Sequence, residues 1–296
     1  MGKGSTKRQH FVPRFYLRHF AGNDGMLSAY RRVDDRYFRM RPEGICSERF
    51  LYESRIGTGE DGDAFFQENR IEDELFEVEG RLSKGLDDLL ECCERQDYVN
   101  ERFEEGRLAV CDLVANLIAR SPSFLASDRD HAAKIAEEFA REEKLTPGDW
   151  DLLGLIGLRG SLEPVADAAI MRFTLLSGDP KAPTSHIRDR LAGMRMIVLQ
   201  ASPVMPFISC SMPVSFIGIT DDYSDFTATI LPLSSKFAAM FADGQGAESY
   251  GRLSMEETVQ FNSNALDGNG IWTTAFGRAV GPVKAAVNRC KELEHL

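Results

Sequence analysis

The sequence predicts an α+β protein with an N-terminal hairpin, a helical middle section and a strand-rich C-terminal part. Between residues 64 and 193, apolar side chains recur at spacings of three and four, which is the period of a helix face. After residue 194, short β-rich runs are separated by turns rich in Pro and Asp. Because helical and strand segments are grouped along the chain, α+β is favoured over a doubly wound sheet, which alternates them.

The N-terminal part is expected to hold a short helix and a hairpin. Residues 13–20 form the helix, with Pro13 near its start, where proline is tolerated. The hairpin pairs residues 26–32 with residues 36–41. The glycine-rich region 57–62 is predicted to be a loop.

The longest predicted helix runs from Ala64 to Cys92, with an apolar stripe along one face. Gly80 and Gly85 weaken this helix by about 1 kcal/mol each relative to alanine. A capping-box pattern that begins at Ser254 starts the last predicted helix, which runs to about residue 266. The other predicted helices are 101–120, 128–144, 162–177 and 184–193. The predicted strands are 196–200, 207–209, 214–219, 227–231 and 236–241.

The composition is typical of a globular protein in water, with 43% hydrophobic and 27% charged residues. No apolar run approaches the roughly 20 residues that span a bilayer, and the charged N-terminus lacks the apolar stretch of a secretory signal. We therefore expect a cytoplasmic protein with no membrane contact, folded as one domain over 1–296 with possible sub-parts 1–193 and 194–296. The six cysteines lack metal-finger spacing and are expected to be reduced, mostly buried thiols.

Charge is distributed unevenly along a chain whose formal net charge is −11. Residues 1–50 hold 11 Lys and Arg against 5 Asp and Glu, whereas residues 51–110 hold 7 against 18. An acidic surface repels nucleic acid and anionic membranes, so any contact with nucleic acid is expected through the basic N-terminal segment. The alternative is that this segment packs against the acidic helix that follows it.

The first candidate site surrounds His10, because imidazole acts as a general base, metal ligand or phosphate-binding cation near neutral pH. Arg14 would share a helical face with His10, and its guanidinium offers a fork for phosphate or carboxylate. Gln9, Tyr16 and Arg18 add hydrogen-bond donors for a ligand. The alternative is that His10 and Tyr16 bond to buried backbone and position the N-terminus.

Carboxylates of the longest predicted helix form the second candidate site. Glu68, Glu72 and Glu79 fall on one flank of its apolar stripe. Carboxylates bind hard divalent cations, so Glu72 and Glu79 are the candidate ligands of Mg²⁺ or Mn²⁺. With His10 they would form a hydrolytic site for phosphodiesters. The alternative is an internal ion network with arginines of the N-terminal segment.

A third set of polar residues, Asp112, Asn116 and Arg120, recurs every four residues on the largely apolar helix 101–120. Polar groups on such a helix must be exposed or satisfied. A buried row would line a ligand-binding site, whereas an exposed row would need no functional explanation.

The opening segment runs Gln9-His10-Phe11-Val12-Pro13-Arg14-Phe15-Tyr16-Leu17-Arg18-His19-Phe20. It resembles the start of a bacterial family catalogued as a domain of unknown function, whose members open with Gln-His-aromatic-x-Pro-x-x-Tyr-Leu-x-x-Phe. Members often carry an Asp at the position of Ser211. The resemblance implies one coherent fold but no assigned activity. Weaker similarities lie at Glu48 to Tyr52, Ile71-Glu72, Arg120-Ser121-Pro122, Phe207 to Ser209 and Leu231 to Ser234.

We therefore expect a nucleic-acid-directed, metal-dependent phosphodiesterase or nuclease of the defence or toxin type. His10 would be the base or a metal ligand, Arg14 would hold phosphate, and Glu72 would act in catalysis and bind the metal with Glu79. The first alternative is a non-catalytic module that binds protein or nucleic acid, with His10 against backbone and no cleft joining it to a carboxylate. The second is a hydrolase of small phosphorylated molecules. Walker, GxGxxG, HExxH and nucleophile-elbow motifs are absent, which argues against the usual NTPases, Rossmann enzymes and zincins.

Overall fold

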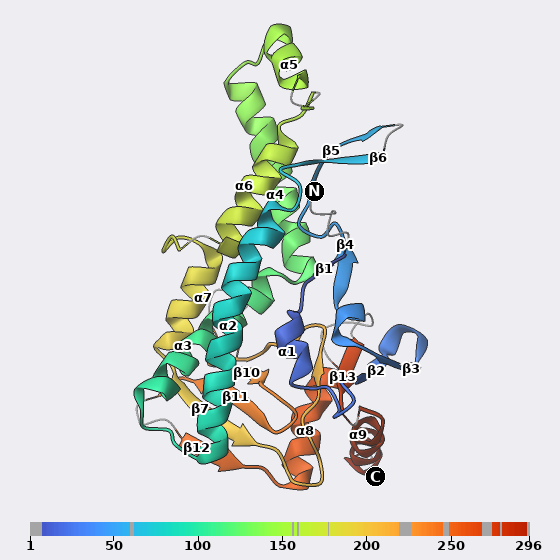
Figure 1. The fold of residues 1–296 in the computed structure, drawn as a ribbon, viewed down its shortest axis with the longest axis vertical. Helices are drawn as coiled ribbons and strands as arrows, with labels where there is room; N and C mark the ends of the chain where they lie inside the picture. The colour runs from blue at the N-terminus through green and yellow to red at the C-terminus, as the bar shows by residue number, and fades with distance from the viewer. Residues whose placement is uncertain are drawn as a thin grey trace.

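The computed structural model describes residues 8–294, except for residues 60–61, 156, 159, 177, 219–225, 245–248, 268–273 and 279. The molecule is elongated, with helices rising at one end and most strands gathered at the other (Figure 1). Helices predominate in the middle of the chain, and the strands lie mainly before and after them. The predicted α+β class is therefore confirmed.

The predicted helices occur in the predicted order, and α3, α6 and α7 match their predicted ranges closely, whereas α5 and α9 are additional to the prediction. The bounds are α1 (Arg14–Arg18), α2 (Arg70–Arg95), α3 (Glu101–Ala119), α4 (Pro122–Glu142), α5 (Pro147–Gly154), α6 (Glu163–Leu176), α7 (Pro183–Ala192), α8 (Met255–Asp267) and α9 (Val280–Glu294). Helix α4 begins earlier than predicted because Ser121 caps it by accepting a hydrogen bond from the Phe124 N–H. The predicted capping box is confirmed, since Ser254 and Glu257 exchange side-chain to backbone hydrogen bonds.

The described strands form two larger sheets and two small ones. Strands β12-β7-β11-β10-β9 form a five-stranded sheet, β3-β2-β13-β8 a four-stranded sheet, and β1-β4 and β5-β6 two-stranded pairs. The strand bounds are β1 (Arg8–His10), β2 (Leu27–Arg31), β3 (Arg36–Met40), β4 (Ser47–Arg49), β5 (Ser54–Gly59), β6 (Gly62–Phe66), β7 (Arg195–Gln200), β8 (Ser209–Cys210), β9 (Ser215–Ile217), β10 (Ala228–Pro232), β11 (Phe237–Ala242), β12 (Ser249–Arg252) and β13 (Thr274–Gly277).

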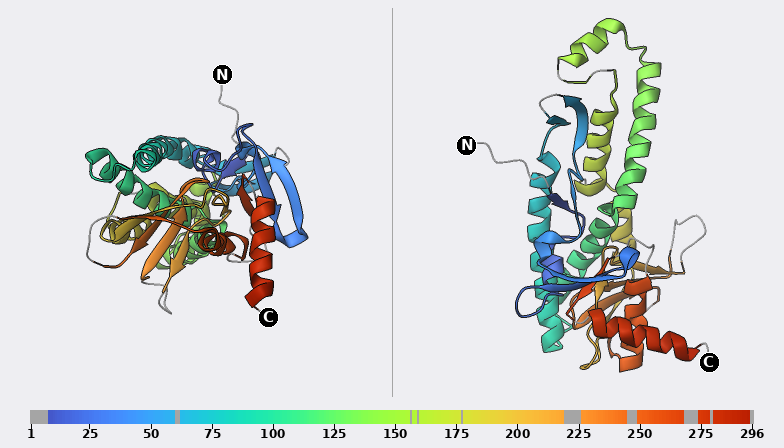
Figure 2. Two further views of the ribbon diagram at one scale, coloured as in Figure 1. Left: turned by 90° about the horizontal axis from the view of Figure 1, so that it is seen from below. Right: turned by 90° about the vertical axis from the view of Figure 1, so that its right-hand side faces the viewer.

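Helix α2 runs along the long axis of the molecule and packs against α3 (Figures 1 and 2). Its predicted apolar stripe is buried at Leu75, Leu82 and Leu86, among others. Gly85 allows the two helices to approach closely, because a Cβ atom there would lie 2.2 Å from the Cβ of Ala109. The glycine that weakens the isolated helix therefore serves the helix–helix contact.

Residues from both ends of the chain share the four-stranded sheet, in which β2 pairs with β13. Tyr16 of α1 is fully buried and donates its hydroxyl to the Pro232 carbonyl at 2.7 Å. The Tyr16 hydroxyl also lies 2.9 Å from Oγ of Ser209. Main-chain and side-chain hydrogen bonds therefore join the expected sub-parts 1–193 and 194–296.

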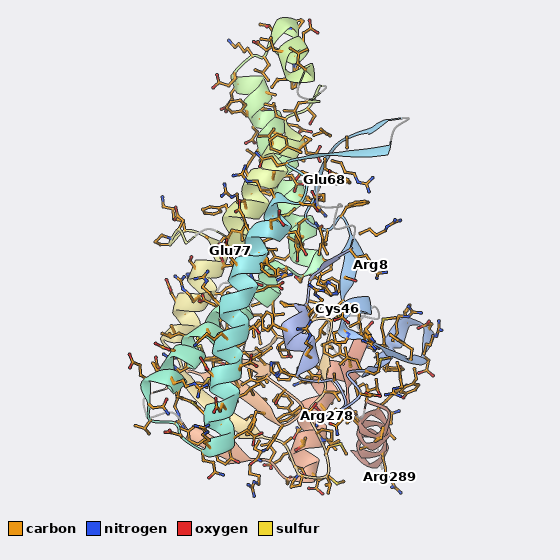
Figure 3. All side chains as sticks on the ribbon, in the orientation of Figure 1. Arg8, Cys46, Glu68, Glu77, Arg278 and Arg289 are labelled. Carbon is orange, nitrogen blue, oxygen red and sulfur yellow. The ribbon has the colours of Figure 1, made fainter. Side chains whose placement is uncertain are left out.

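The segment before α2 differs from the prediction. The expected loop at 57–62 belongs instead, outside residues 60–61, to the antiparallel pair β5 and β6. Its glycines are compatible with this hairpin, whose register shifts next to Gly57. Helix α2 begins at Arg70 rather than Ala64 because Asn69, at φ 62°, adopts a left-handed conformation that a helix cannot include. Glu68 therefore precedes α2, close to its upper end in Figure 3.

The expectation of mostly buried thiols agrees with the described residues, in which Cys46, Cys92, Cys93, Cys111 and Cys210 are buried and form no disulfide. Within the described residues, no single helix is long and apolar enough to cross a membrane. Helices α3 and α4 meet the length and composition criteria only as a pair, which bends by 63° at its break.

Candidate active site

Arg120, at the end of α3, ties together the segments that form the site. Its guanidinium is buried, with 1% of the residue exposed. Nε donates to the Tyr52 hydroxyl at 2.7 Å, Nη1 donates to Oε1 of Glu79 at 2.6 Å, and Nη2 donates to the His10 carbonyl. The Tyr52 hydroxyl in turn donates to the same carbonyl at 2.8 Å. One buried cation thereby holds β1, the chain after β4, and α2 in a common arrangement.

Gln9 belongs to the same buried framework. The residue is fully buried, and its side-chain amide donates to Oε1 of Glu53 at 2.7 Å. Its amide oxygen accepts a hydrogen bond from the Tyr52 N–H at 2.8 Å. The Glu53 carboxylate also accepts from the Asn69 N–H, directly before α2. Gln9 therefore positions the start of α2 and does not face the cavity described next.

A cavity of about 500 Å³ lies between the N-terminal segment and α2. It brings together the three predicted catalytic residues and the second predicted metal ligand, which the sequence separates by up to 69 positions. Glu77, on the same helix, also lines it, and Figure 3 shows this residue on α2. The lining residues are His10, Arg14, Glu72, Asp73, Leu75, Phe76, Glu77 and Glu79.

Two buried polar atoms of this cavity have no hydrogen-bond partner in the described part of the chain: Nε2 of His10 and Oε2 of Glu72. The imidazole does make a hydrogen bond with the Pro42 backbone. Since Nε2 has no partner and proline has no N–H, this bond joins Nδ1–H to the Pro42 carbonyl. The neutral ring then carries its proton on Nδ1 and keeps a lone pair on Nε2.

The electrostatics of the cavity favour the uncharged forms of both groups. The pKa of Glu72 is raised from 4.5 to about 7, mainly by burial, with Arg120 opposing the shift and the nearby charge of Glu79 adding to it. Burial, with a contribution from the cation Arg14, lowers the pKa of His10 below 6.5. Near neutral pH the site therefore combines a neutral imidazole with a carboxyl group that is close to its titration midpoint.

Arg14, the first residue of α1, is exposed and lines the cavity. Within the described residues its guanidinium forms no ion pair, so its donors remain available to an anion. Arg18 lies one turn further along α1, is also exposed, and pairs weakly with Glu43 at 3.7 Å. Arg18 does not line the cavity, and Tyr16 is bonded within the core.

The predicted row on α3 runs from the surface into the interior. The Asp112 side chain is 50% exposed and lies 3.9 Å from Arg188, beside a separate cavity of about 240 Å³. Asn116 is buried, and its Oδ1 accepts a hydrogen bond from Nη1 of Arg120 at 3.3 Å. Asn116 therefore supports Arg120, which holds the His10 carbonyl, while Asp112 lies apart from the His10 segment.

The residues that are in place fit a divalent metal only in part. The described residues contain no group of three or more His, Cys, Asp or Glu side chains placed to hold an ion. Glu72 and Glu79 line one cavity, but Oε1 of Glu79 is bonded to Arg120. A magnesium ion at these two carboxylates would keep several waters or take ligands from a substrate, as this ion commonly does.

Three residues that support the site were not selected from the sequence: Pro42, Tyr52 and Glu53. Tyr52 lies in the segment Glu48 to Tyr52, whose weak similarity to the family was the sequence feature that could have indicated it. Pro42 and Glu53 act through backbone and buried carboxylate contacts that depend on the folded chain.

The fold and the cavity define an α+β protein with a candidate acid–base site between its N-terminal segment and a long helix. The model of the family described as "Protein of unknown function (DUF4238)" matches residues 8–267, and the chain belongs to this family. The expected membership of a domain-of-unknown-function family is thus confirmed. The match begins directly before the motif that starts at Gln9 and ends with α8. No curated protein and no solved structure matches the chain significantly.

Proposed function

We propose that this protein hydrolyses phosphodiester bonds of nucleic acid at the cavity that contains His10, Arg14 and Glu72. The observation that supports this most is the pair of buried, unpartnered atoms, Nε2 of His10 and Oε2 of Glu72, beside a guanidinium without an ion pair. Unsatisfied buried polar atoms are costly, so their concentration in one cavity favours a ligand that completes their bonding.

In the proposed reaction, Arg14 binds the non-bridging oxygens of the phosphate. A water molecule attacks phosphorus while Nε2 of His10 accepts one of its protons. The bond between phosphorus and the leaving oxygen breaks, and the protonated Glu72 carboxyl gives its proton to that oxygen. The products are a phosphomonoester and a free hydroxyl, and proton exchange with solvent restores both side chains.

Nucleic acid is proposed as substrate because the basic N-terminal segment of this acidic chain forms one wall of the cavity, whereas α2 supplies the carboxylates of the other wall. Arg8 and Arg14 are both exposed on the N-terminal segment that borders it. Such local cations bind a polyanion even when the net charge of the protein is negative. A bacterial origin, a place in the cytoplasm and a role in defence or toxicity belong to this proposal and rest on the resemblance and the composition.

Metal dependence is a distinct version of the same proposal. In it, Mg²⁺ or Mn²⁺ binds Glu72 and Glu79, and Glu72 acts as an ionised ligand instead of a proton donor. Glu72 must be protonated in the first version and ionised in the second. The effect of added metal on activity and the dependence of activity on pH therefore distinguish the two versions.

The non-catalytic binding module is the second candidate. It requires that His10 has a backbone partner, which the Pro42 carbonyl provides. It also requires that no cleft joins His10 to a carboxylate, whereas both His10 and Glu72 line one cavity. This geometry favours the hydrolase over the binding module.

The test is cleavage of labelled single- and double-stranded DNA and RNA, in Mg²⁺, in Mn²⁺ and in chelator, with small phosphodiesters as a further substrate class. His10→Ala and Glu72→Gln are each expected to lower the rate of cleavage by about 10²–10⁴, and Arg14→Ala to weaken cleavage. Arg18→Ala is the matched control, since Arg18 is exposed on the same helix but outside the cavity. Failure of the wild-type protein to cleave any substrate would leave the binding module as the better account, provided that the protein is folded.

A further inference from the structure

A second, larger cavity of about 660 Å³ lies where β4 and β5 meet α4 and α6. Strands β5 and β6 run beside α6, as the contacts and both ribbon views show (Figures 1 and 2). Glu53 lines this cavity and also accepts the hydrogen bond from Gln9, the neighbour of His10. The two cavities share no lining residue, and the Gln9–Glu53 hydrogen bond connects the second cavity to the residue next to His10.

Arginine side chains supply positive charge to the second cavity. Arg49 is exposed and forms no ion pair within the residues that the structure describes. Arg129 is anchored, since its Nη2 donates to the Leu51 carbonyl, and its Nε lies 3.8 Å from Oδ1 of Asp167. One guanidinium without an ion pair and one anchored guanidinium in a concave site are suited to a phosphate group.

An aromatic side chain lies beside these cations. Phe50 follows Arg49 directly, lines the cavity and is half-buried. Its ring centroid is 4.7 Å from that of Phe65, with which it makes a tilted pair. Phe50 also has a φ of 56°, a left-handed conformation that is unfavourable for a bulky residue. The ring is thus held at the wall of the cavity that Arg49 also lines, at a backbone cost, and a flat ligand in the cavity can stack on it.

A buried acceptor completes the site. Asp167 is buried, and its Oδ2 accepts a hydrogen bond from the Ser54 hydroxyl at 2.6 Å. Its other oxygen, Oδ1, is buried without a hydrogen-bond partner among the described residues. Burial raises the pKa of this carboxyl, while Ser54 and Arg129 oppose the shift. A hydroxyl or amine hydrogen of a ligand would satisfy Oδ1.

We propose that this second cavity binds a nucleoside phosphate. Arg49 and Arg129 hold the phosphate, the base stacks on Phe50, and a sugar hydroxyl or base N–H donates to Oδ1 of Asp167. The volume suits a ligand of this size, since small-molecule sites commonly span about 300–1,000 Å³. The same chemistry is present in a free nucleotide and in the terminal nucleotide of a strand. Binding at this site does not require that the His10 cavity cleaves anything, so the inference goes beyond the proposed function.

The test is calorimetric titration of the full chain with nucleoside monophosphates, with adenosine, with inorganic phosphate and with a 5′-phosphorylated oligonucleotide. Nucleotides are expected to bind, and adenosine and phosphate alone are expected to bind at least about tenfold more weakly, because each lacks half of the contacts. Tighter binding of the oligonucleotide would identify the strand terminus as the source, and tighter binding of mononucleotides would identify the free nucleotide. Phosphate that binds as well as the nucleotides would overturn the assignment of a nucleotide.

Variants place the binding in the cavity. Arg49→Ala is expected to weaken nucleotide binding about tenfold or more, and Phe50→Leu to weaken it several-fold. Arg36→Ala is the matched control, because Arg36 is an exposed arginine of the same basic segment that does not line this cavity. Arg49→Gln provides a second test if Arg49→Ala lowers the melting temperature. Equal losses in Arg49→Ala and Arg36→Ala, or no nucleotide binding by the folded wild-type protein, would overturn the proposal.

The His10→Ala variant separates the two proposals. It is expected to bind nucleotides like the wild type, because His10 does not line the second cavity. In the wild-type protein, nucleotide binding without cleavage would refute only the hydrolase, whereas cleavage without nucleotide binding would refute only the second site.

Discussion

The guanidinium of Arg120 donates a hydrogen bond to the carbonyl of His10, across 110 positions of the sequence. Helix α3 therefore holds the backbone of the residue whose imidazole borders the candidate active site. The same guanidinium pairs with Glu79, so the N-terminal segment and α2 depend on one buried cation. Arg120 therefore affects both the position of His10 and the charge of Glu79 at the cavity.

Loss of this cation should destabilise the protein. Arg120→Met is expected to lower the free energy of unfolding by about 3–5 kcal/mol, because Glu79 loses its buried cation and the Tyr52 hydroxyl its donor, while the His10 carbonyl keeps only the hydrogen bond from Tyr52. Urea denaturation followed by circular dichroism measures the change. Arg102→Met is the control: Arg102 is an exposed arginine that pairs with Asp88, and its loss should cost far less. Equal effects of the two variants would contradict the central role of Arg120.

The dependence of activity on pH should reveal the roles of His10 and Glu72. With a neutral His10 as base and a protonated Glu72 as acid, kcat/KM is expected to follow a bell. Its acid limb lies below pH 6.5, because the pKa of His10 is lowered by burial, and its alkaline limb lies near pH 7, where Glu72 ionises. Glu72→Gln should lower kcat by about 10²–10⁴ and remove the alkaline limb.

The metal-dependent version of the proposal predicts the opposite change of activity with pH. If Glu72 binds the metal as a carboxylate, activity should rise as the pH increases through about 7, where this group loses its proton. Measurement of cleavage across this range, with and without chelator, therefore decides between the two roles of Glu72.

The stability of the protein should also depend on Glu72. Because the folded state raises the pKa of this group from 4.5 to about 7, its contribution to stability is complete below pH 4.5 and is lost as the pH rises to about 7. Solvent screens a partly buried carboxyl, so we expect the free energy of unfolding to fall by about 1–2 kcal/mol over this range. Glu72→Gln should remove this dependence on pH, so the variant should become more stable relative to the wild type as the pH rises.

Urea denaturation of both proteins at about pH 5 and about pH 8 measures this difference. Comparison of the two proteins cancels the contribution of His10, whose lowered pKa acts in the opposite direction. Glu77→Gln, an exposed change on the same helix, is the matched control. If the difference in free energy of unfolding between the wild type and Glu72→Gln stays constant with pH, the burial of this carboxyl is contradicted.

Two glycines of α2 should respond in opposite ways to alanine. Gly80→Ala is expected to stabilise the protein by about 0.5–1 kcal/mol, because an added Cβ meets nothing within 4 Å and alanine favours the helix. Gly85→Ala is expected to destabilise it by about 1–3 kcal/mol, because the new Cβ would lie 2.2 Å from that of Ala109. Melting temperatures of the two variants test the close approach of α2 and α3, and a shift of the same sign in both would refute it.

The sequence by itself determined the parts that depend on local patterns. The stripe of α2 and the capping box at Ser254 follow from residue spacing and side-chain chemistry, which act within a few positions of the chain. The sequence also led to the prediction that His10, Arg14 and Glu72 share one site, and all three line the same cavity.

Only the tertiary structure decided how distant residues share their bonds. Arg120 was expected to bind a ligand but serves the framework, because its donors are used by groups as far away in sequence as His10. The pairing of β2 with β13 and the cavity beside Phe50 and Asp167 likewise join segments that carry no local signal for one another. Spacing patterns report which face of an element is buried, whereas the partner of a buried polar group is set by the packing of the whole chain.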